Sequence, residues 1–324
     1  MDKVWKEALG MLAQGELVSG AAIGGRLGIS RTAVWKHLNQ LQQWGVPIKK
    51  IKGQGYYIEN GIELLSRSCI VRAMSPESAV LLGDLQLLDN IDSTNSFVRE
   101  KLDSVAERSF ACLAERQSEG RGRHGREWVS PYGRNIYLSL SWNFDEGVAA
   151  MEGLSLAVGV VVARVIESFG VEGVTLKWPN DILLGGRKVG GVLLEMMGDP
   201  VGSCQVVVGI GINLGMTKEV AIGQPWADLA NYAQLSRNSL ASALLSELLL
   251  ALEGYSGCGF FAYRDEWESL DAYRNCPIKL ITPRMTVRGV DRGVSSTGAI
   301  QIEVDGALQS YSGGEISLRS DSDS

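Results

Sequence analysis

The feature that most constrains the fold is a basic, acid-free segment between residues 17 and 58. The whole chain has a formal net charge of −6, whereas this segment has six lysines and arginines and no aspartate or glutamate. Within it, residues 20–27 have the composition of a short helix and residues 28–29 that of a tight turn. Ser30 is a suitable N-cap for a second helix that ends near Trp44. This order and spacing predict a helix-turn-helix unit.

The second predicted helix has one apolar face and one polar face. Val34, Leu38 and Leu41 follow helical spacing, so they are expected to pack inward. The side chains expected to point outward are those of Arg31, Thr32, Trp35, Lys36 and Asn39. Cationic and amide groups on such a face suit phosphates and base edges. This face is therefore predicted to bind DNA.

A basic hairpin follows the second helix. Residues 48–52 alternate as a strand, residues 53–55 supply a turn, and residues 56–58 return as a second strand. This hairpin has the features of a wing, on which Lys50 and Lys52 are further predicted DNA contacts. A small helical domain with merely solvated charges is the alternative interpretation. The order of helix, turn, helix and basic hairpin within one segment favours DNA binding.

The length and composition allow two or three packed domains. The chain has 324 residues, of which 45% are hydrophobic. A stretch of weaker periodicity, residues 60–76, predicts the first boundary, and the pattern changes again near Cys276. The predicted domains are a winged helix over residues 1–62, a central domain over residues 63–275 and a small β domain over residues 276–324.

The middle of the chain alternates apolar strands with amphipathic segments, and residues 155–169 and 239–252 have helical periodicity. This pattern predicts an α+β fold in which a mixed central sheet has helices on one side. The tail, residues 320–324, is expected to be disordered. Short strands separated by Gly, Asp and Pro turns predict a small all-β barrel at the C-terminus, with strands at residues 277–281, 286–290, 299–304 and 307–311.

The composition argues against several classes of protein. Five cysteines without a C-x-x-C pair, and only two histidines, argue against a structural zinc site and against a disulfide framework. No stretch reaches the roughly 18 uninterrupted apolar residues of a membrane span. Residues 1–6 are charged and do not open a signal peptide. We therefore expect a cytoplasmic protein that has no membrane partner.

The strongest chemical signal is the loop at residues 120–126, where three glycines alternate with three arginines and His124. Glycines allow close backbone approach, and guanidinium groups suit phosphate or carboxylate, so the loop predicts an anion site. The loop also matches the pattern G-x-G-x-x-G, which in a dinucleotide-binding fold is followed by an amphipathic helix. Here residues 128–133 would interrupt a helix, and residues 135–142 alternate like a strand. This context argues against a dinucleotide-binding turn. A flexible basic hairpin remains the alternative for the loop alone.

A second group of positive charges lies further along the chain. Lys177 ends an apparent strand before a Trp-Pro-Asn-Asp run, in which Pro179 interrupts the ladder. Lys188 follows a glycine turn and opens an apolar strand, residues 188–195. Each lysine alone is typical of a solvated surface. Together with the arginine loop, they predict convergent positive charge.

At this point a set of motifs resembles the biotin–protein ligases, namely residues 93–95, Gln117, residues 120–126, 177–181 and 188–191. With the helix-turn-helix in front, the chain looks like the bifunctional bacterial form, the biotin operon repressor. The resemblance extends to residues 313–319 and covers nearly the whole chain. It implies that the central domain is catalytic and that the C-terminal barrel is SH3-like.

The resemblance also implies an activity. Biotin and ATP condense to biotinyl-5′-adenylate and pyrophosphate, with Mg²⁺, and the adenylate acylates one lysine of a biotin carboxyl carrier domain. It further implies a homodimer when the adenylate is bound, and repression through operator DNA. Attack of a carboxylate on an α-phosphate needs positioning and charge stabilisation rather than a nucleophilic side chain, so the scarcity of histidine is no objection.

The resemblance assigns roles to individual residues. The predicted substrate-binding residues are Ser93, Thr94, Asn95, Gln117, Gly120, Arg121, Gly122, Arg123, Trp128, Lys188 and Asn213. Ser93, Thr94 and Gln117 would hydrogen-bond biotin, with Asn95 beside them and Trp128 as an apolar wall. Arg121 and Arg123 would hold the carboxylate and phosphate, and Asn213 would contact the adenylate.

The predicted catalytic residues are Arg123, Lys188 and Asp181. Lys188 would stabilise the α-phosphate and acyl oxygen. Asp181 is a candidate for orienting or accepting the proton of the target lysine. A carboxylate that only hydrogen-bonds its own turn is the equal alternative for Asp181.

The sequence departs from the family at three places, and two rival functions stay open. His124 stands where an arginine is expected, which predicts weaker retention of the adenylate. Residues 216–226 match the family's adenylate-covering loop poorly. Residues 144–148, near the expected dimer contact, also differ from the family. A lipoate ligase of similar fold is the nearest enzyme rival, against which the loop at 120–126 favours biotin. A sensor without catalysis would not need both Arg123 and Lys188.

Overall fold

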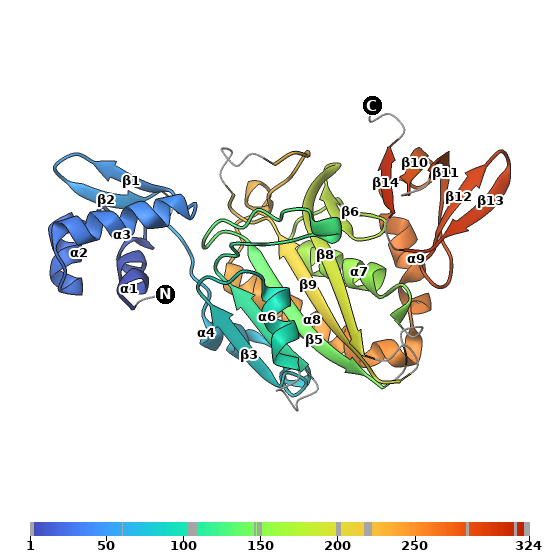
Figure 1. The fold of residues 1–324 in the computed structure, drawn as a ribbon, viewed down its shortest axis with the longest axis horizontal. Coiled ribbons are helices and arrows are strands. Elements are labelled where there is room, and N and C mark those ends of the chain that lie inside the picture. The colour runs from blue at the N-terminus through green and yellow to red at the C-terminus, as the bar shows by residue number, and fades with distance from the viewer. Residues whose placement is uncertain are drawn as a thin grey trace.

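The structure is a computed structural model in which three units follow one another along the chain (Figure 1). It describes residues 3–59, 61–102, 109–145, 147, 151–198, 202–216, 222–282, 285–313 and 316–320. The residues outside these ranges include parts of three predicted regions, at 144–148, 216–226 and 320–324. Within the described residues, none of the helices is both long enough and apolar enough to cross a bilayer.

The N-terminal unit is the predicted winged helix. Its elements are α1 (Lys3–Leu12), α2 (Gly20–Leu27), α3 (Arg31–Gln43), β1 (Ile48–Ile51) and β2 (Gly55–Ile58). Ser30 caps α3, because its Oγ accepts a hydrogen bond from the backbone N–H of Ala33 at 3.2 Å. Gly28 ends α2 with φ of 66°, a conformation that glycine adopts without strain. Val34, Leu38 and Leu41 are buried, so the predicted inward face is confirmed.

The central unit is built on a seven-stranded sheet in the order β3-β4-β5-β9-β8-β7-β6. Its strands are β3 (Asp84–Leu88), β4 (Ser109–Ala114), β5 (Ile136–Phe144), β6 (Val174–Lys177), β7 (Asp181–Leu184), β8 (Arg187–Gly198) and β9 (Cys204–Ile212). Only β3 and β4 pair in parallel among these strands, and the other pairs are antiparallel. The predicted mixed sheet is therefore confirmed.

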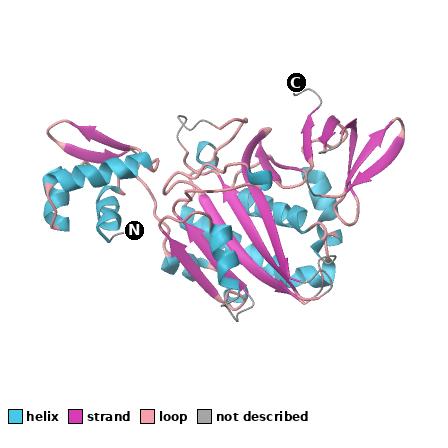
Figure 2. Ribbon diagram, viewed as in Figure 1, coloured by secondary structure: helices cyan, strands magenta, loops and turns pink. Residues whose placement is uncertain are grey.

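Helices cover both faces of this sheet, which corrects the prediction that they lie on one side (Figure 2). The helices are α4 (Arg67–Ala73), α5 (Pro76–Ala79), α6 (Thr94–Lys101), α7 (Leu154–Ser168), α8 (Arg237–Cys258) and α9 (Phe261–Leu270). Leu138, Leu140 and Trp142 of β5 pack into the main core with α7 and α8. On the opposite face, Val98 of α6 packs against Phe110 of β4. Alternate residues of a strand point to opposite faces, so an alternating strand such as β4 supplies both cores.

The predicted boundary region also contains more structure than its weak periodicity indicated. Ser66 caps α4 by accepting a hydrogen bond from the backbone N–H of Cys69 at 3.4 Å. Ile70 of this helix is buried in the main core beneath α8. The segment before α4 is held by Arg237, which donates to the backbone oxygen of Glu63 at 2.6 Å and pairs with Glu115 at 2.7 Å. The boundary at residue 62 remains a prediction.

The C-terminal unit is a five-stranded antiparallel sheet in the order β13-β12-β11-β10-β14. Its strands are β10 (Pro277–Ile281), β11 (Thr286–Val294), β12 (Ile300–Val304), β13 (Ala307–Tyr311) and β14 (Ser317–Ser320). The predicted small all-β unit is confirmed. The fifth strand corrects the predicted disorder at Ser320, because this residue pairs with Ile278 of β10. Residues 321–324 lie outside the described residues.

The winged helix contacts the central unit at the end of α3. The rings of Trp44 and Tyr132 stack with centroids 6.1 Å apart, and the backbone N–H of Tyr132 donates to the carbonyl oxygen of Trp44 at 2.9 Å. Gly45 has φ of 90°, and a Cβ there would lie 2.9 Å from the Cβ of Pro131. The end of the predicted DNA-contacting helix is thus held against the loop that leads back to Trp128.

Two carboxyl groups, the half-buried Asp271 and the buried Asp291, lie where α9 meets the C-terminal sheet. Burial, followed by the charge of Asp291, raises the pKa of Asp271 to about 7. Burial raises the pKa of Asp291 to about 6. The Oδ1 atoms accept the backbone N–H groups of Tyr273 at 3.0 Å and of Gly293 at 2.7 Å. Each Oδ2 atom is buried without a hydrogen-bond partner among the described residues.

These shifts predict that the folded state loses stability as pH rises. Both folded-state pKa values lie above 3.8, the usual pKa of an aspartate side chain. The stabilising contribution is therefore present below about pH 4 and is lost as pH rises toward 7. Asp291→Asn keeps the shape and removes the ionisation. We expect urea unfolding to show the variant more stable than the wild type at pH 8, with a smaller difference at pH 5. Parallel stability profiles for the two proteins would contradict this.

Candidate active site

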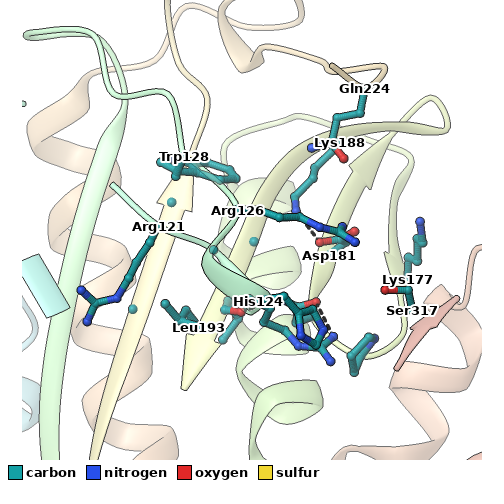
Figure 3. A pocket seen from close by; sticks show the side chains of 18 of the residues that line it. Arg121, His124, Arg126, Trp128, Lys177, Asp181, Lys188, Leu193, Gln224 and Ser317 are labelled. Atoms are coloured by element: carbon teal, nitrogen blue, oxygen red, sulfur yellow. Dashed lines mark hydrogen bonds and ion pairs between the residues drawn. The ribbon is translucent and has the colours of Figure 1, made fainter. Parts of the chain in front are cut away.

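A cavity of about 900 Å³ opens where the sheet, the arginine loop and the C-terminal unit meet (Figure 3). Its wall includes the start of α6, the loop at residues 121–128, and parts of β8 and β9. The turn between β6 and β7 and the strand β14 close the opposite side. The predicted residues that line the cavity are Ser93, Thr94, Asn95, Gln117, Arg121, Gly122, Arg123, Trp128, Asp181 and Lys188.

One end of the cavity carries the lysine and its carboxylate partner. Lys188 Nζ lies 2.5 Å from Asp181 Oδ1 and 5.5 Å from the centre of the Trp128 ring. Both charged side chains are largely inside the protein, at 18% and 19% exposed. The bulge between Ile182 and Leu183 shifts the register, so Lys188 pairs with Leu183 at the mouth of the hairpin. The structure therefore places a cation and a carboxylate together at this end.

Arg123 lies on the same side of the cavity. Its Nη1 donates to Asn180 Oδ1 at 3.3 Å, and its Nη2 donates to the carbonyl oxygen of Ile316 at 3.1 Å. Burial lowers the pKa of Arg123, and the negative charge of Asp181 opposes that shift. Arg123 thus bridges the arginine loop, the turn after β6 and the C-terminal unit.

The other end of the cavity carries neutral polar groups. Gln117 Oε1 accepts hydrogen bonds from the backbone N–H of Thr94 at 2.9 Å and from its hydroxyl at 3.0 Å. Gln117 Nε2 donates to Ser130 Oγ at 3.3 Å, and this hydroxyl donates to the carbonyl oxygen of Trp128 at 2.8 Å. Ser93 is the N-cap of α6, with its Oγ facing the N–H of Ser96. These groups can recognise a polar, uncharged ring.

Arg121 points away from Lys188 and Asp181 (Figure 3). Its Nη2 donates to Glu195 Oε1 at 2.9 Å, and its Nη1 donates to Ser96 Oγ at 2.7 Å. The structure therefore separates the guanidinium groups of Arg121 and Arg123, which the sequence places side by side. In this arrangement the charge of Arg121 belongs to the neutral polar end of the cavity.

Glycines keep the floor of the cavity open. A Cβ at Gly209 would overlap with Asn95 Oδ1, and a Cβ at Gly211 would lie 2.5 Å from the Trp128 ring. Because neither glycine has a side chain, the Asn95 amide and the Trp128 ring can lie directly on β9. Gly120 does not line the cavity, and a Cβ there would lie 2.5 Å from the carbonyl oxygen of Trp128. Within the loop, His124 has φ of 57° and is exposed.

Asn213 is the other predicted substrate-binding residue that does not line the cavity. Its side chain is buried, and its Nδ2 donates to the carbonyl oxygen of Ala227 at 3.1 Å. The neighbouring peptide joins the site, because the backbone N–H of Ala227 donates to the carbonyl oxygen of Lys188 at 2.9 Å. Asn213 thus fixes the backbone behind the lysine.

Several residues of the site were not predicted from the sequence. They include Ser139, Asn180, Glu195 and Tyr273. Glu195 carried a signal, since it is the one charged residue in the last ten residues of β8, 189–198, an otherwise apolar run. Ser139 is fully buried on β5, and a buried hydroxyl group needs a hydrogen-bond partner.

The predicted DNA-binding side chains form an open face on the winged helix. Arg31, Thr32 and Lys36 are exposed, and Trp35 is 50% exposed. Asn39 is half-buried on the same helix. Lys50 and Lys52 are exposed on the wing, where Lys50 Nζ lies 5.8 Å from the centre of the Tyr56 ring.

Comparisons with known proteins match both parts of this arrangement. A sequence model of the Biotin/lipoate A/B protein ligase family matches residues 87–213, and one of an HTH domain matches residues 5–57. The bifunctional ligase/repressor BirA of Escherichia coli (strain K12) is 40% identical over 315 residues, which are 96% of each chain. The chain belongs to the bifunctional ligase/repressor family. The BirA of Bacillus subtilis (strain 168) is 28% identical over 94% of this chain and 95% of its own.

A solved structure supports the fold of this family member. The biotin protein ligase from Aquifex aeolicus in complex with biotin and ATP aligns with a TM-score of 0.63 and 27% identity. The alignment covers 74% of this chain and 99% of the Aquifex chain. The family resemblance drawn from the motifs is therefore confirmed, whereas the roles of individual residues stay predictions.

Proposed function

We propose that this chain is a biotin–protein ligase that forms biotinyl-5′-AMP from biotin and ATP, and also a DNA-binding repressor of biotin synthesis genes. The observation that supports the ligase most strongly is a cavity with two chemically different ends. Neutral hydrogen-bonding groups stand at one end, and a lysine and an arginine stand at the other. The neutral end suits the polar ring of an acid, and the cationic end suits the phosphates of a nucleotide.

At the neutral end, we propose that Ser93, Thr94 and Gln117 bind the ring of biotin, with Asn95 beside them. Trp128 supplies an apolar wall for the rest of the acid. The guanidinium of Arg121 lies at this end as well, so its proposed contact with the carboxylate requires the loop that carries Gly120 and Gly122 to rearrange when the acid binds. The support is that Thr94, Gln117 and Trp128 are already joined by the hydrogen bonds through Ser130.

At the cationic end, we propose that Lys188 and Arg123 bind the α-phosphate and stabilise the charge that develops there. The acid's carboxylate attacks the phosphorus, and pyrophosphate leaves with its electron pair. No side-chain nucleophile takes part, so the rate depends on positioning and on fixed positive charge. Asn213 acts from behind, through the peptide of Ala227 that is bonded to Lys188.

We propose that Mg²⁺ binds together with the nucleotide. Among the described residues, no three histidine, cysteine or carboxylate side chains gather as a metal site. Mg²⁺ is usually held by substrate phosphates and one or two carboxylates, and Asp181 is a carboxylate that lines the cationic end. The ion would neutralise charge on the phosphates.

We propose that the second step transfers biotin to one lysine of a biotin carboxyl carrier domain. The amine attacks the acyl carbon, and AMP leaves. Asp181 is the residue we assign to orient or accept the amine proton. The test is to incubate the protein with biotin, ATP and a carrier domain and to locate biotin by mass spectrometry. Labelling of one carrier lysine is expected, and a carrier that stays unmodified would contradict the proposal.

The DNA-binding half gives a prediction of its own. Replacing Arg31 and Lys36 by alanine removes two exposed cations from the face on α3. We expect operator affinity to fall about tenfold or more, and the salt slope of binding to become shallower by about two. The matched control is Arg72→Ala with Arg99→Ala, which removes two exposed cations from the central unit. Equal losses in both double variants, measured by fluorescence anisotropy, would contradict it.

We further propose that the adenylate orders the arginine loop and promotes a homodimer, so that two winged helices bind a palindromic operator. His124 would weaken adenylate retention in this loop. We also propose that this function is carried out in the cytoplasm and that the domain boundaries follow residues 62 and 275. Sedimentation that shows a monomer both with and without the adenylate would contradict dimerisation.

A further inference from the structure

Glu195 of β8 fixes the orientation of a neighbouring amide at the neutral end of the cavity. Arg121 Nη2 donates to Glu195 Oε1 at 2.9 Å and to Oε2 at 3.2 Å, and Asn95 Nδ2 donates to Oε2 at 2.9 Å. A carboxylate paired with a guanidinium only accepts hydrogen bonds. The nitrogen of the Asn95 amide must therefore face Glu195, and its oxygen must face the other way.

The oxygen of Asn95 begins a row of four oxygen atoms. Asn95 Oδ1 lies 2.5 Å from Ser139 Oγ, which lies 2.8 Å from Thr94 Oγ1. Thr94 Oγ1 lies 3.0 Å from Gln117 Oε1. The backbone N–H of Thr94 also donates to Gln117 Oε1 at 2.9 Å, so this atom of the Gln117 amide is the oxygen. Both ends of the row are carbonyl oxygens, which carry no hydrogen.

The row has fewer hydrogens than contacts. Its three O···O contacts share only the two hydroxyl hydrogens of Ser139 and Thr94. The Ser139 hydrogen goes to Asn95, and that of Thr94 serves either Ser139 or Gln117. Lone pairs are left over at Thr94 in either case, and at Gln117 when the Thr94 hydrogen serves Ser139, and both residues line the cavity. A bound N–H group pointing at these two oxygens supplies the missing hydrogen.

We propose that Glu195 is a positioning residue that makes Thr94 and Gln117 net hydrogen-bond acceptors. The site then selects an acid whose ring carries N–H donors, as the cyclic urea of biotin does. The dithiolane ring of lipoate carries none. This inference rests on the proposed function and names what separates the two acids.

A neutral residue at position 195 would remove this selection. The Asn95 amide is then free to turn, and its Nδ2 donates to Ser139. The Ser139 hydrogen passes to Thr94, and the Thr94 hydrogen passes to Gln117, so every contact in the row has a hydrogen. The row no longer needs a ligand donor. With Glu195 charged, the turned amide would place two oxygens, Asn95 Oδ1 and Glu195 Oε2, against each other.

The first experiment is Glu195→Gln, with binding of biotin and of ATP measured separately by calorimetry. We expect biotin affinity to fall about tenfold, because an acceptor matched to the ligand is lost. We expect ATP affinity and the melting temperature to stay close to those of the wild type. A cyclic carbamate analogue of biotin, with one ureido N–H replaced by oxygen, should lose much less than biotin does on the same change.

The second experiment moves the charge to the neighbouring side chain. In N95D/E195Q, the carboxylate introduced at position 95 accepts from Ser139 and from the amide of residue 195, whose oxygen still accepts from Arg121. The row keeps its hydrogen count, so biotin affinity should return to within about threefold of the wild type. Asn95→Asp alone places two carboxylates against each other and should bind biotin worst of all. Glu266→Gln, which loses the exposed partner of Arg164, is the matched control and should bind biotin normally.

Several results would overturn the proposal. They are unchanged biotin affinity in Glu195→Gln, equal losses for biotin and ATP with a lower melting temperature, or no recovery in N95D/E195Q. Binding is separable from chemistry: if the wild type binds biotin and the variants follow the expected order but no adenylate forms, the ligase proposal fails and the role of Glu195 stands. A wild type that does not bind biotin overturns both.

Discussion

Replacing Lys188 by alanine is expected to lower the rate of adenylate formation about 10²- to 10³-fold. Lys188 lies at the cationic end of the cavity, and its Nζ lies 2.5 Å from Asp181 Oδ1. With the lysine gone, the negative charge of Asp181 is left facing the phosphates. The loss should therefore fall on the chemical step. Rapid-quench measurement of biotinyl-5′-AMP during the first turnover checks this.

The same variant should retain the neutral end of the cavity. Biotin affinity, measured by calorimetry, is expected to change little, because Thr94 and Gln117 are bonded to each other and not to Lys188. Arg187→Ala is the matched control, since this neighbouring cation donates to Tyr232 Oη at 3.0 Å and does not line the cavity. Wild-type rates in Lys188→Ala, or equal losses in both variants, would contradict the assigned role.

Arg237→Ala is expected to destabilise the protein by about 3–5 kcal/mol. Arg237 Nη1 lies 2.7 Å from Glu115 Oε2, and the two side chains are only 5% and 1% exposed. Glu115 Oε1 also accepts the backbone N–H of Leu65 at 2.6 Å. Removing the guanidinium leaves a buried carboxylate without a counter-charge. The melting temperature, followed by calorimetry, should fall by roughly 10 °C.

Two further variants separate burial from the mere loss of an ion pair. Arg164→Ala breaks the pair with Glu266, in which the side chains are 48% and 36% exposed, and should cost at most about 1 kcal/mol. Replacing both Arg237 and Glu115 by leucine removes the stranded charge and should recover part of the stability. If the double variant is no more stable than Arg237→Ala, or if the two alanine variants lose equal stability, the argument from burial fails.

The winged helix was predictable because its signals are local. Ser30 caps the helix that directly follows it, and Gly28 supplies the positive φ between the two helices. The wing reverses direction within residues 52–54, between strands that pair residue by residue. None of these features depends on a residue far along the chain.

The elements that were missed depend on distant contacts. With seven residues, α4 is too short to show a clear period, and it is stabilised by burying Ile70 beneath α8. Strand β14 is completed only by pairing with β10. The second helical face of the sheet follows from α6 packing on Phe110, which sequence periodicity does not reveal.

The candidate site shows the same division. The arginine loop and Lys188 were found from composition and spacing, because glycine and cationic side chains are unusual at that density. The partner of Arg121 was not, since Glu195 lies 74 residues away in sequence. Asn95 and Glu195 are 100 residues apart and meet only through the order of the strands. Contacts of this kind are fixed by sheet register, which no short motif records.

The most direct test of the central claim is to incubate the purified protein with Mg-ATP and biotin, lipoate or no acid, and to measure pyrophosphate and bound acyl-adenylate. The account predicts pyrophosphate release and a bound biotinyl-5′-AMP with biotin alone. An adenylate formed with lipoate in place of biotin would make the protein a ligase of the other acid. No adenylate with either acid would contradict catalysis and leave a DNA-binding sensor.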